Sequence, residues 1–207
     1  MLPTNRFKII FPEINTVDYL ELSFPEEQAL SDDEFFQFCQ ENELIKPERN
    51  KEGKILIRTL PGLNTSRRNV HITVELTLWN RTHNFGLVLP NVGFYLPDGA
   101  MFSPNVAVLS QASWENLTKK ERDQFPYVCP EFVVELMSKS DQLKTLQEKM
   151  QNWLANGAKL AWLIDPAEEK VYIYRPQQSV KIVTGFDHII SGEEILKGLS
   201  FDLKVLR

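Results

Sequence analysis

The segment Phe132-Val133-Val134-Glu135-Leu136-Met137 places one charged residue inside a run of strand-forming residues. Its length and apolar character are typical of a strand in the core of a sheet. A carboxylate in such a strand is costly to bury unless a positive charge or a shell of hydrogen bonds compensates it. Glu135 could lie at a solvated sheet edge or pair with an arginine for structure. The apolar residues on both sides of it favour a functional carboxylate instead.

A lysine that follows Glu135 by fourteen residues, Lys149, lies on an expected amphipathic helix. Ser138-x-x-Asp141 predicts that this helix starts near residue 140 and runs to about 156, where Gly157 ends it. The strand continues for ~10 Å beyond Glu135, and the helix extends for ~12 Å from Asp141 to Lys149. Because a crossover helix must turn back across the sheet, these similar lengths return Lys149 to the level of Glu135. At the flank of the apolar stripe its long side chain can reach the carboxylate, although an ordinary surface lysine is the alternative.

The other segments predict a mixed α/β sheet with helices on its faces. Ser31-x-x-Glu34 is a capping box that starts a helix, and Pro97-Asp98-Gly99 is a hairpin turn before a strand from Met101 to Leu109. Arg68 to Arg81 has apolar residues on two faces, which predicts a largely buried helix. We expect residues 1–30 to form an N-terminal arm and residues 31–207 to form a single domain.

The composition excludes several classes of protein. With 207 residues, 43% hydrophobic and 25% charged, the chain is typical of a soluble globular protein with a sizeable core. No apolar run reaches the roughly 20 residues of a membrane span, so no membrane association is expected. The two cysteines lie in apolar contexts, which favours buried thiols and fits a cytoplasmic location. A net charge of −5 argues against a general nucleic-acid coat protein.

Three strings occur together and in order: LPDGAMFSPNVAVLS, CPEFVVELMSKSDQLKTLQEKMQNWLANGAKLAWLIDP and VYIYRP. They resemble the bacterial Uma family of restriction-endonuclease-like proteins, from about residue 31 to the C-terminus and most strongly over residues 94–176. The resemblance implies the PD-(D/E)xK nuclease core, a central mixed sheet flanked by helices. It also implies hydrolysis of nucleic-acid phosphodiester bonds with Mg²⁺ or Mn²⁺, a DNA substrate and a homodimer.

Within this resemblance, Glu135 corresponds to a metal-binding carboxylate and Lys149 to the catalytic lysine, displaced from the strand onto the following helix. Carboxylate oxygens suit Mg²⁺, and an ammonium group can stabilise a developing oxyanion. The family's metal-binding aspartate aligns with Asn105, so the chain departs from the pattern there. Asparagine keeps an amide oxygen but lacks the charge, which predicts weak metal binding.

Two further carboxylates could support the site. Asp98 matches the literal Pro-Asp of the motif, but it belongs at the tip of a hairpin, beyond ~13 Å of extended strand from Met101 to Asn105. Glu75, on the helix expected from Arg68 to Arg81, is the best replacement for the missing charge. The alternative for Glu75 is a solvated glutamate at the flank of the helix.

Two functions therefore follow from the sequence. The first is a metal-dependent endonuclease, weakened by Asn105. The second is a catalytically inactive relative that kept the fold and binds nucleic acid or a protein partner, because a fold does not fix a function.

Overall fold

A computed structural model describes residues 20–22, 29–42, 45–58 and 61–207 of the chain. Most of the expected arm, residues 1–30, lies outside this described part. Among the described residues, no helix is long and apolar enough to cross a membrane.

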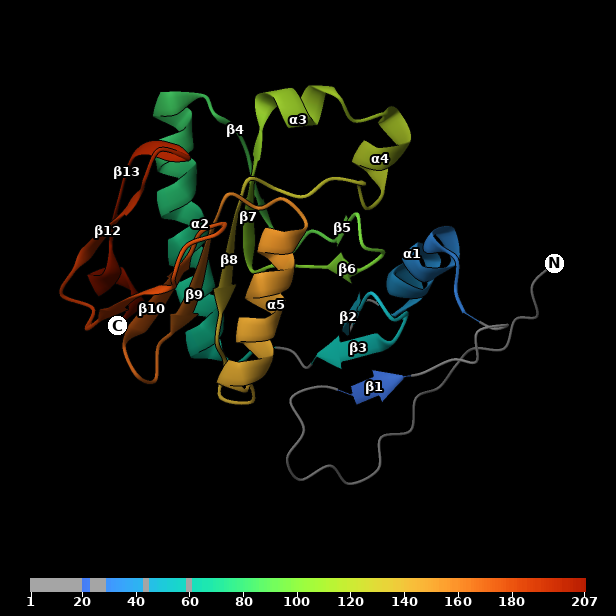
Figure 1. The fold of residues 1–207 in the computed structure, drawn as a ribbon, viewed down its shortest axis with the longest axis horizontal. Helices are drawn as coiled ribbons and strands as arrows, with labels where there is room; N and C mark the ends of the chain where they lie inside the picture. The colour runs from blue at the N-terminus through green and yellow to red at the C-terminus, as the bar shows by residue number, and fades with distance from the viewer. Residues whose placement is uncertain (1–19, 23–28, 43–44, 59–60) are drawn as a thin grey trace.

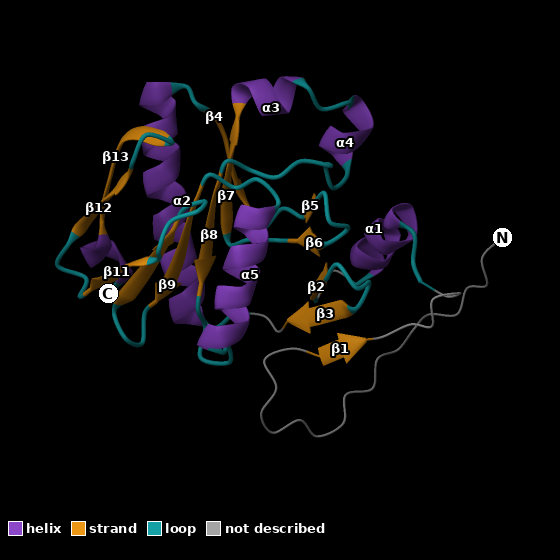
Figure 2. Ribbon diagram, in the orientation of Figure 1, coloured by secondary structure: helices purple, strands orange, loops and turns teal. Residues whose placement is uncertain are grey.

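A six-stranded mixed sheet forms the centre of the molecule, with strand order β11-β10-β9-β8-β7-β4 (Figures 1 and 2). Only β8 and β9 are parallel, and the other neighbours are antiparallel. This arrangement confirms the mixed sheet predicted from the sequence. The strands are β4 (Gly86–Pro90), β7 (Val106–Ser110), β8 (Phe132–Leu136), β9 (Leu160–Asp165), β10 (Lys170–Tyr174) and β11 (Lys181–Thr184).

Helices cover both faces of this sheet (Figure 1). Helix α5 (Leu143–Ala155) crosses over between the parallel strands β8 and β9 and packs on one face. Helix α2 (Leu63–His83) packs on the other face, together with the hairpin of β12 (Ile189–Gly192) and β13 (Leu196–Asp202). Because side chains alternate along a strand, β8 sends Val134 toward α2 and Val133 toward α5. The same alternation directs Glu135 toward α5.

The expectation that the helix around Arg68–Arg81 is largely buried was wrong for one of its faces. Ile72, Leu76 and Trp79 are buried against the sheet, but a second set faces solvent. A helix that packs on a single layer buries one stripe only, because nothing covers the opposite side. The exposed apolar residues are Val70, Val74 and Leu78.

A second, smaller sheet has strand order β1-β3-β2-β6-β5 and lies beside α1 (Figure 2). The single strand expected from Met101 to Leu109 is divided in two: β6 belongs to this sheet and β7 to the central one. Residues 103–105 join them, so this short link connects the two sheets. The strands are β1 (Leu20–Leu22), β2 (Lys46–Arg49), β3 (Ile55–Arg58), β5 (Phe94–Tyr95) and β6 (Met101–Phe102).

The helix termini differ in how well the sequence predicts them. Helix α1 (Asp32–Glu41) begins with the expected capping box, in which Ser31 and Glu34 bond to each other's backbone. Helix α5 begins at residue 143 with Gln142 as its N-cap and no side-chain cap. Ser138 and Asp141 instead form a turn before the helix, with the Ser138 amide donating to the Asp141 carboxylate. The remaining helices are α3 (Gln111–Glu115), α4 (Lys119–Asp123) and the 3₁₀ helix η2 (Leu203–Leu206).

Candidate functional site

Glu135 is buried on the α5 face of the central sheet, near the carboxyl end of β8. Its side chain is 3% exposed, and it is paired in register with Leu163 of the parallel strand β9. The structure therefore places this carboxylate in the core and not at a solvated edge of the sheet. Its charge is compensated by Lys149, whose Nζ lies 2.7 Å from Glu135 Oε1.

Lys149 also binds a second buried carboxylate, that of Glu48, with Nζ 2.6 Å from Glu48 Oε1. The three side chains are between 2% and 6% exposed. One ammonium group thus bridges two carboxylates, one from the strand β8 and one from the strand β2. We call Glu48, Glu135 and Lys149 the acid–lysine cluster.

Glu48 was not predicted from the sequence. Its strand, Lys46-Pro47-Glu48-Arg49, has no apolar alternation that would indicate which side chain is buried. The site residue reaches the centre through the small sheet: β2 pairs with β6 at Arg49 and Met101, next to the link between the two sheets. The amide of Ser103 in that link donates to Glu48 Oε1 at 2.8 Å and fixes the carboxylate.

Two aromatic side chains complete the surroundings of the cluster. Trp153, one turn after Lys149 on α5, donates its Nε1–H to Glu135 Oε1 at 3.1 Å. The ring of Phe102 lies beneath the ammonium group, with Nζ 5.3 Å from the ring centroid. Both contacts stabilise the charged forms in a low-dielectric environment, where a hydrogen bond or a cation–π contact is worth more than in water.

Asn105 lies beside the cluster and performs a structural task. Its Oδ1 accepts a hydrogen bond at 2.8 Å from the backbone amide of Leu136, the residue after Glu135. Asn105 therefore ties the link between the sheets to β8, and it also lines the same pocket as Glu48 and Glu135.

The two supporting carboxylates considered from the sequence lie elsewhere. Asp98 is exposed in the hairpin turn, where its Oδ1 accepts from the amide of Ala100. Glu75 is half-buried on α2. Neither residue lines the pocket that contains Glu135, so the structure does not bring them to the acid–lysine cluster.

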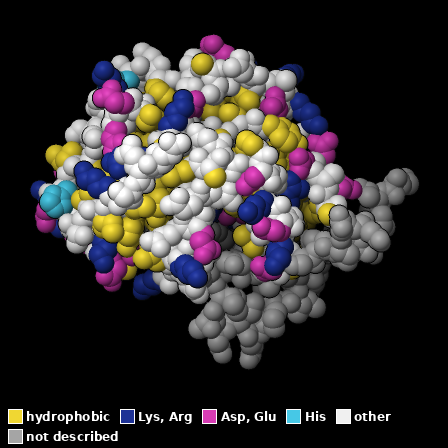
Figure 3. Space-filling view, in the orientation of Figure 1, with side chains coloured by type: hydrophobic (Ala, Val, Ile, Leu, Met, Phe, Trp, Pro, Cys, Tyr) yellow, Lys and Arg dark blue, Asp and Glu magenta, His cyan; other side chains and the backbone are white. Residues whose placement is uncertain are grey.

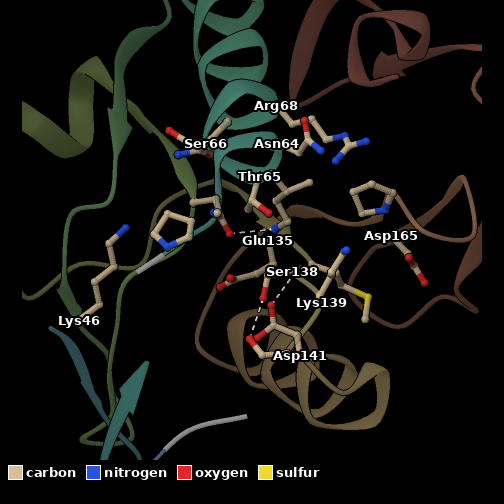
Figure 4. Close-up of a pocket in the computed structure, with 18 of the residues that line it drawn as sticks. Lys46, Asn64, Thr65, Ser66, Arg68, Glu135, Ser138, Lys139, Asp141 and Asp165 are labelled. Carbon is tan, nitrogen blue, oxygen red and sulfur yellow. Dashed lines mark hydrogen bonds between the residues drawn. The ribbon is translucent and has the colours of Figure 1, made fainter. Parts of the chain in front are cut away.

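Glu48 and Glu135 line an open pocket of about 910 Å³. Figure 4 shows Glu135 between the first turn of α2 and the turn formed by Ser138 and Asp141. The first turn of α2 supplies small polar side chains and no acidic residue. The labelled lining residues are Lys46, Asn64, Thr65, Ser66, Arg68, Ser138, Lys139, Asp141 and Asp165.

Asp165 belongs to this wall but makes local bonds. Its Oδ1 accepts from the amides of Ala167 and Glu168, which closes the turn after β9. It stands at the end of the strand next to β8, which explains why the pocket includes it.

The charges around the pocket are mixed. Burial lowers the pKa of Lys46 below its ordinary value, and the carboxylates of Glu48 and Glu135 oppose this shift. Lys46 Nζ donates to Asn91 Oδ1 at 2.6 Å on the pocket wall. Figure 3 shows acidic and basic side chains interspersed over the face in view, without an extended field of one sign.

The acid–lysine cluster suits a hard divalent cation. Mg²⁺ is usually held by one or two carboxylates and keeps several waters, so it does not require a cage of protein ligands. Among the described residues, no group of three or more His, Cys, Asp or Glu side chains could hold a metal ion. Glu48 and Glu135 are two buried carboxylates that share a single positive charge, and they could hold such a cation together with water ligands.

Comparison with protein families places the chain in one family. Residues 32–204 match the Uma2 family, described as "Putative restriction endonuclease". The chain belongs to the Uma2 family. This match confirms the resemblance inferred from the sequence, and it covers Glu48 as well as Glu135 and Lys149. No curated protein matches the chain.

Among solved structures, the Uma2 chain is similar to one from Anabaena variabilis, described as "a putative nuclease belonging to DUF820". The two share 19% sequence identity with a TM-score of 0.68, over 77% of this chain and 88% of the other. At this identity the likeness establishes the fold and nothing further.

Proposed function

We propose that this protein is a divalent-metal-dependent endonuclease that hydrolyses DNA phosphodiester bonds in the pocket above β8. The observation that carries the proposal is the acid–lysine cluster: Glu48 and Glu135 line an open pocket, and the buried Lys149 bridges their two carboxylates. Burying charged groups destabilises a fold. Clusters of buried charges are therefore found at functional sites more often than in other parts of a protein. Membership of the Uma2 family supports the same conclusion.

Each residue of the cluster has a role in such a reaction. Glu48 and Glu135 would hold Mg²⁺ or Mn²⁺, which when bound supplies positive charge against the phosphate and acidifies a nearby water. The ammonium group of Lys149 can orient the attacking water or stabilise charge that develops on a phosphate oxygen. Trp153 and the Ser103 amide keep the two carboxylates in place through their hydrogen bonds.

A plasmid-nicking assay tests the proposal. The full chain should nick supercoiled plasmid with Mg²⁺ or Mn²⁺, and EDTA should stop the reaction. Glu135→Gln should lower nicking to the EDTA level, because it removes a charge but keeps an oxygen that can accept from Trp153. Glu148→Gln, an exposed change on the same helix, is the matched control and should keep full activity. Absence of nicking by the folded wild-type protein with either metal would refute the nuclease function.

The second candidate is an inactive relative that binds nucleic acid or a protein partner, and Asn105 is the observation that favours it. The amide of Asn105 stands where the resemblance expects an aspartate, and its oxygen already accepts from the Leu136 amide. This alternative predicts plasmid binding that is indifferent to EDTA, without nicking. A gel-shift assay run beside the nicking assay separates the two functions.

Asn105→Asp should tighten Mg²⁺ binding by about tenfold, because a third carboxylate beside Glu48 and Glu135 adds negative charge to a site for a hard divalent cation. One aspartate oxygen can keep the bond to the Leu136 amide while the other faces the pocket that residue 105 lines. Isothermal calorimetry with Mg²⁺ measures the change. Asn116→Asp, exposed and outside the pocket, controls for net charge. Equal affinity in wild type and Asn105→Asp would show that residue 105 is no ligand.

The resemblance also implies a homodimer, which we propose because two sites could then address the two strands of a duplex. Analytical ultracentrifugation of the full chain tests it, and a sedimentation coefficient of a monomer at assay concentrations would contradict it.

A further inference from the structure

We propose that Lys149 occupies the cation position of its own site in the metal-free protein and must leave at least one carboxylate before a divalent cation binds there. Lys149 would then set the metal affinity of the site in addition to any part in the chemistry. This inference deepens the proposed function and rests on it for the identity of the site.

Lys149 occupies one oxygen atom of each carboxylate in the cluster. Lys149 Nζ contacts Oε1 of both glutamates, at 2.6 Å from Glu48 and 2.7 Å from Glu135. A group that lies within hydrogen-bond distance of both oxygens occupies the space between the two carboxylates. A Mg²⁺ ion shared by the same carboxylates needs that space, since its oxygen ligands lie at about 2.0–2.1 Å.

The positive charge of Lys149 opposes the binding of a second cation at the cluster. An ammonium group and a divalent cation repel each other, and the repulsion is strong in a buried environment of low dielectric constant. All three side chains of the cluster are almost fully buried, so water screens this repulsion poorly. Lysine and metal cannot both bridge the pair, and each compensates the same negative charge when the other is absent.

The side chain of Lys149 can detach from the two carboxylates. Lysine carries its charge on a flexible four-carbon stem, and the two carboxylates that Lys149 bridges line an open pocket. Its bridging contacts are made by the Nζ atom alone, so a rotation of the stem can break them without moving α5. The carboxylates themselves stay fixed, because the Ser103 amide and Trp153 hold them independently of the lysine.

Lys149 and the metal ion therefore compete for the same two carboxylates. Metal binding must first displace an internal cation, which lowers the apparent metal affinity in the way that any unfavourable prior equilibrium does. A neutral residue of similar length at position 149 removes the competitor and keeps the stem. The site should then bind metal more tightly although it can no longer work as the wild type does.

Calorimetric titration of the full chain with Mn²⁺ tests this inference. Lys149→Met should bind Mn²⁺ about tenfold more tightly than the wild type, since a repelling charge next to the ion is gone. Lys144→Met is the matched control, because it removes an exposed lysine from the same helix and should leave the affinity unchanged. Equal or weaker binding by Lys149→Met overturns the inference.

A second measurement does not depend on the stability of the variant. In crystals of the wild-type protein soaked with Mn²⁺, the anomalous peak should lie between Glu48 and Glu135, with Lys149 Nζ detached from at least one of them. A peak elsewhere, with Lys149 still bridging both carboxylates, overturns the inference.

The outcomes separate this inference from the proposed nuclease function. Wild-type nicking with an unchanged Mn²⁺ affinity in Lys149→Met would leave the nuclease function standing and refute the competition. Tighter Mn²⁺ binding by Lys149→Met without any nicking by the wild type would support the competition and refute the nuclease function.

Discussion

Glu48→Gln should reduce metal-dependent plasmid nicking by more than about a hundredfold, because changes even to the outer partners of metal ligands cost about 10–100-fold. Glutamine keeps the shape of the side chain and an oxygen for the Ser103 amide. It removes the negative charge that, with Glu135, would hold the ion. The rate of conversion of supercoiled plasmid, measured at saturating protein, gives the size of the effect.

The control for Glu48→Gln comes from the same hairpin. Glu52 lies in the turn between β2 and β3, and its side chain is 54% exposed. Glu52→Gln changes the net charge equally and should nick plasmid like the wild type. If Glu48→Gln is folded by its thermal melting curve and nicks at the wild-type rate, Glu48 is not part of the active site.

Lys149→Met should lower the free energy of unfolding by about 3–5 kcal/mol when metal is removed by EDTA, the usual loss when one partner of a buried ion pair is deleted. Two carboxylates that are 2% and 3% exposed would then share no ammonium group. Urea denaturation at neutral pH measures the loss. A surface change such as Lys144→Met should remain within about ±0.5 kcal/mol.

The origin of this loss can be checked within the cluster. If uncompensated charge causes it, then Glu48→Gln and Glu135→Gln combined with Lys149→Met should recover most of the lost stability. A triple variant as unstable as Lys149→Met alone would mean that the methionine disturbs packing around Trp153 or Phe102. A loss below about 1 kcal/mol in Lys149→Met would show that the bridge contributes as little as an exposed pair does.

The pairing of Glu135 with Lys149 could be predicted because Glu135 lies in a short apolar run and Lys149 lies on a helix with clear hydrophobic periodicity. A buried strand and a crossover helix determine where their side chains return, and the structure brings the two within 2.7 Å. The hydrogen bond from Trp153 to Glu135 could not be predicted in this way, because it depends on the register of α5 on the sheet.

Glu48 could not be predicted, and the reason is physical. Its strand is short, polar and interrupted by Pro47, so its burial comes from long-range pairing with β6 and not from local pattern. The break at Ser103–Asn105 was missed although Ser103-Pro104-Asn105 interrupts the apolar residues there, because a local turn signal does not specify that the chain changes sheet. Exposure of Val70 and Val74 on α2 likewise depends on which layers are present, which periodicity does not specify.

The division of one expected strand between two sheets has a consequence for how far the protein can be shortened. One acid comes from each sheet, and the link of residues 103–105 contacts both: the Ser103 amide donates to Glu48, and Asn105 Oδ1 accepts from the Leu136 amide next to Glu135. A fragment that begins at α2 would keep all six strands of the central sheet and its two covering helices, yet it would lose Glu48, one of the two carboxylates of the acid–lysine cluster. The smallest unit that holds the complete acid–lysine cluster therefore extends upstream to the β2–β3 hairpin, although this hairpin lies outside the central sheet.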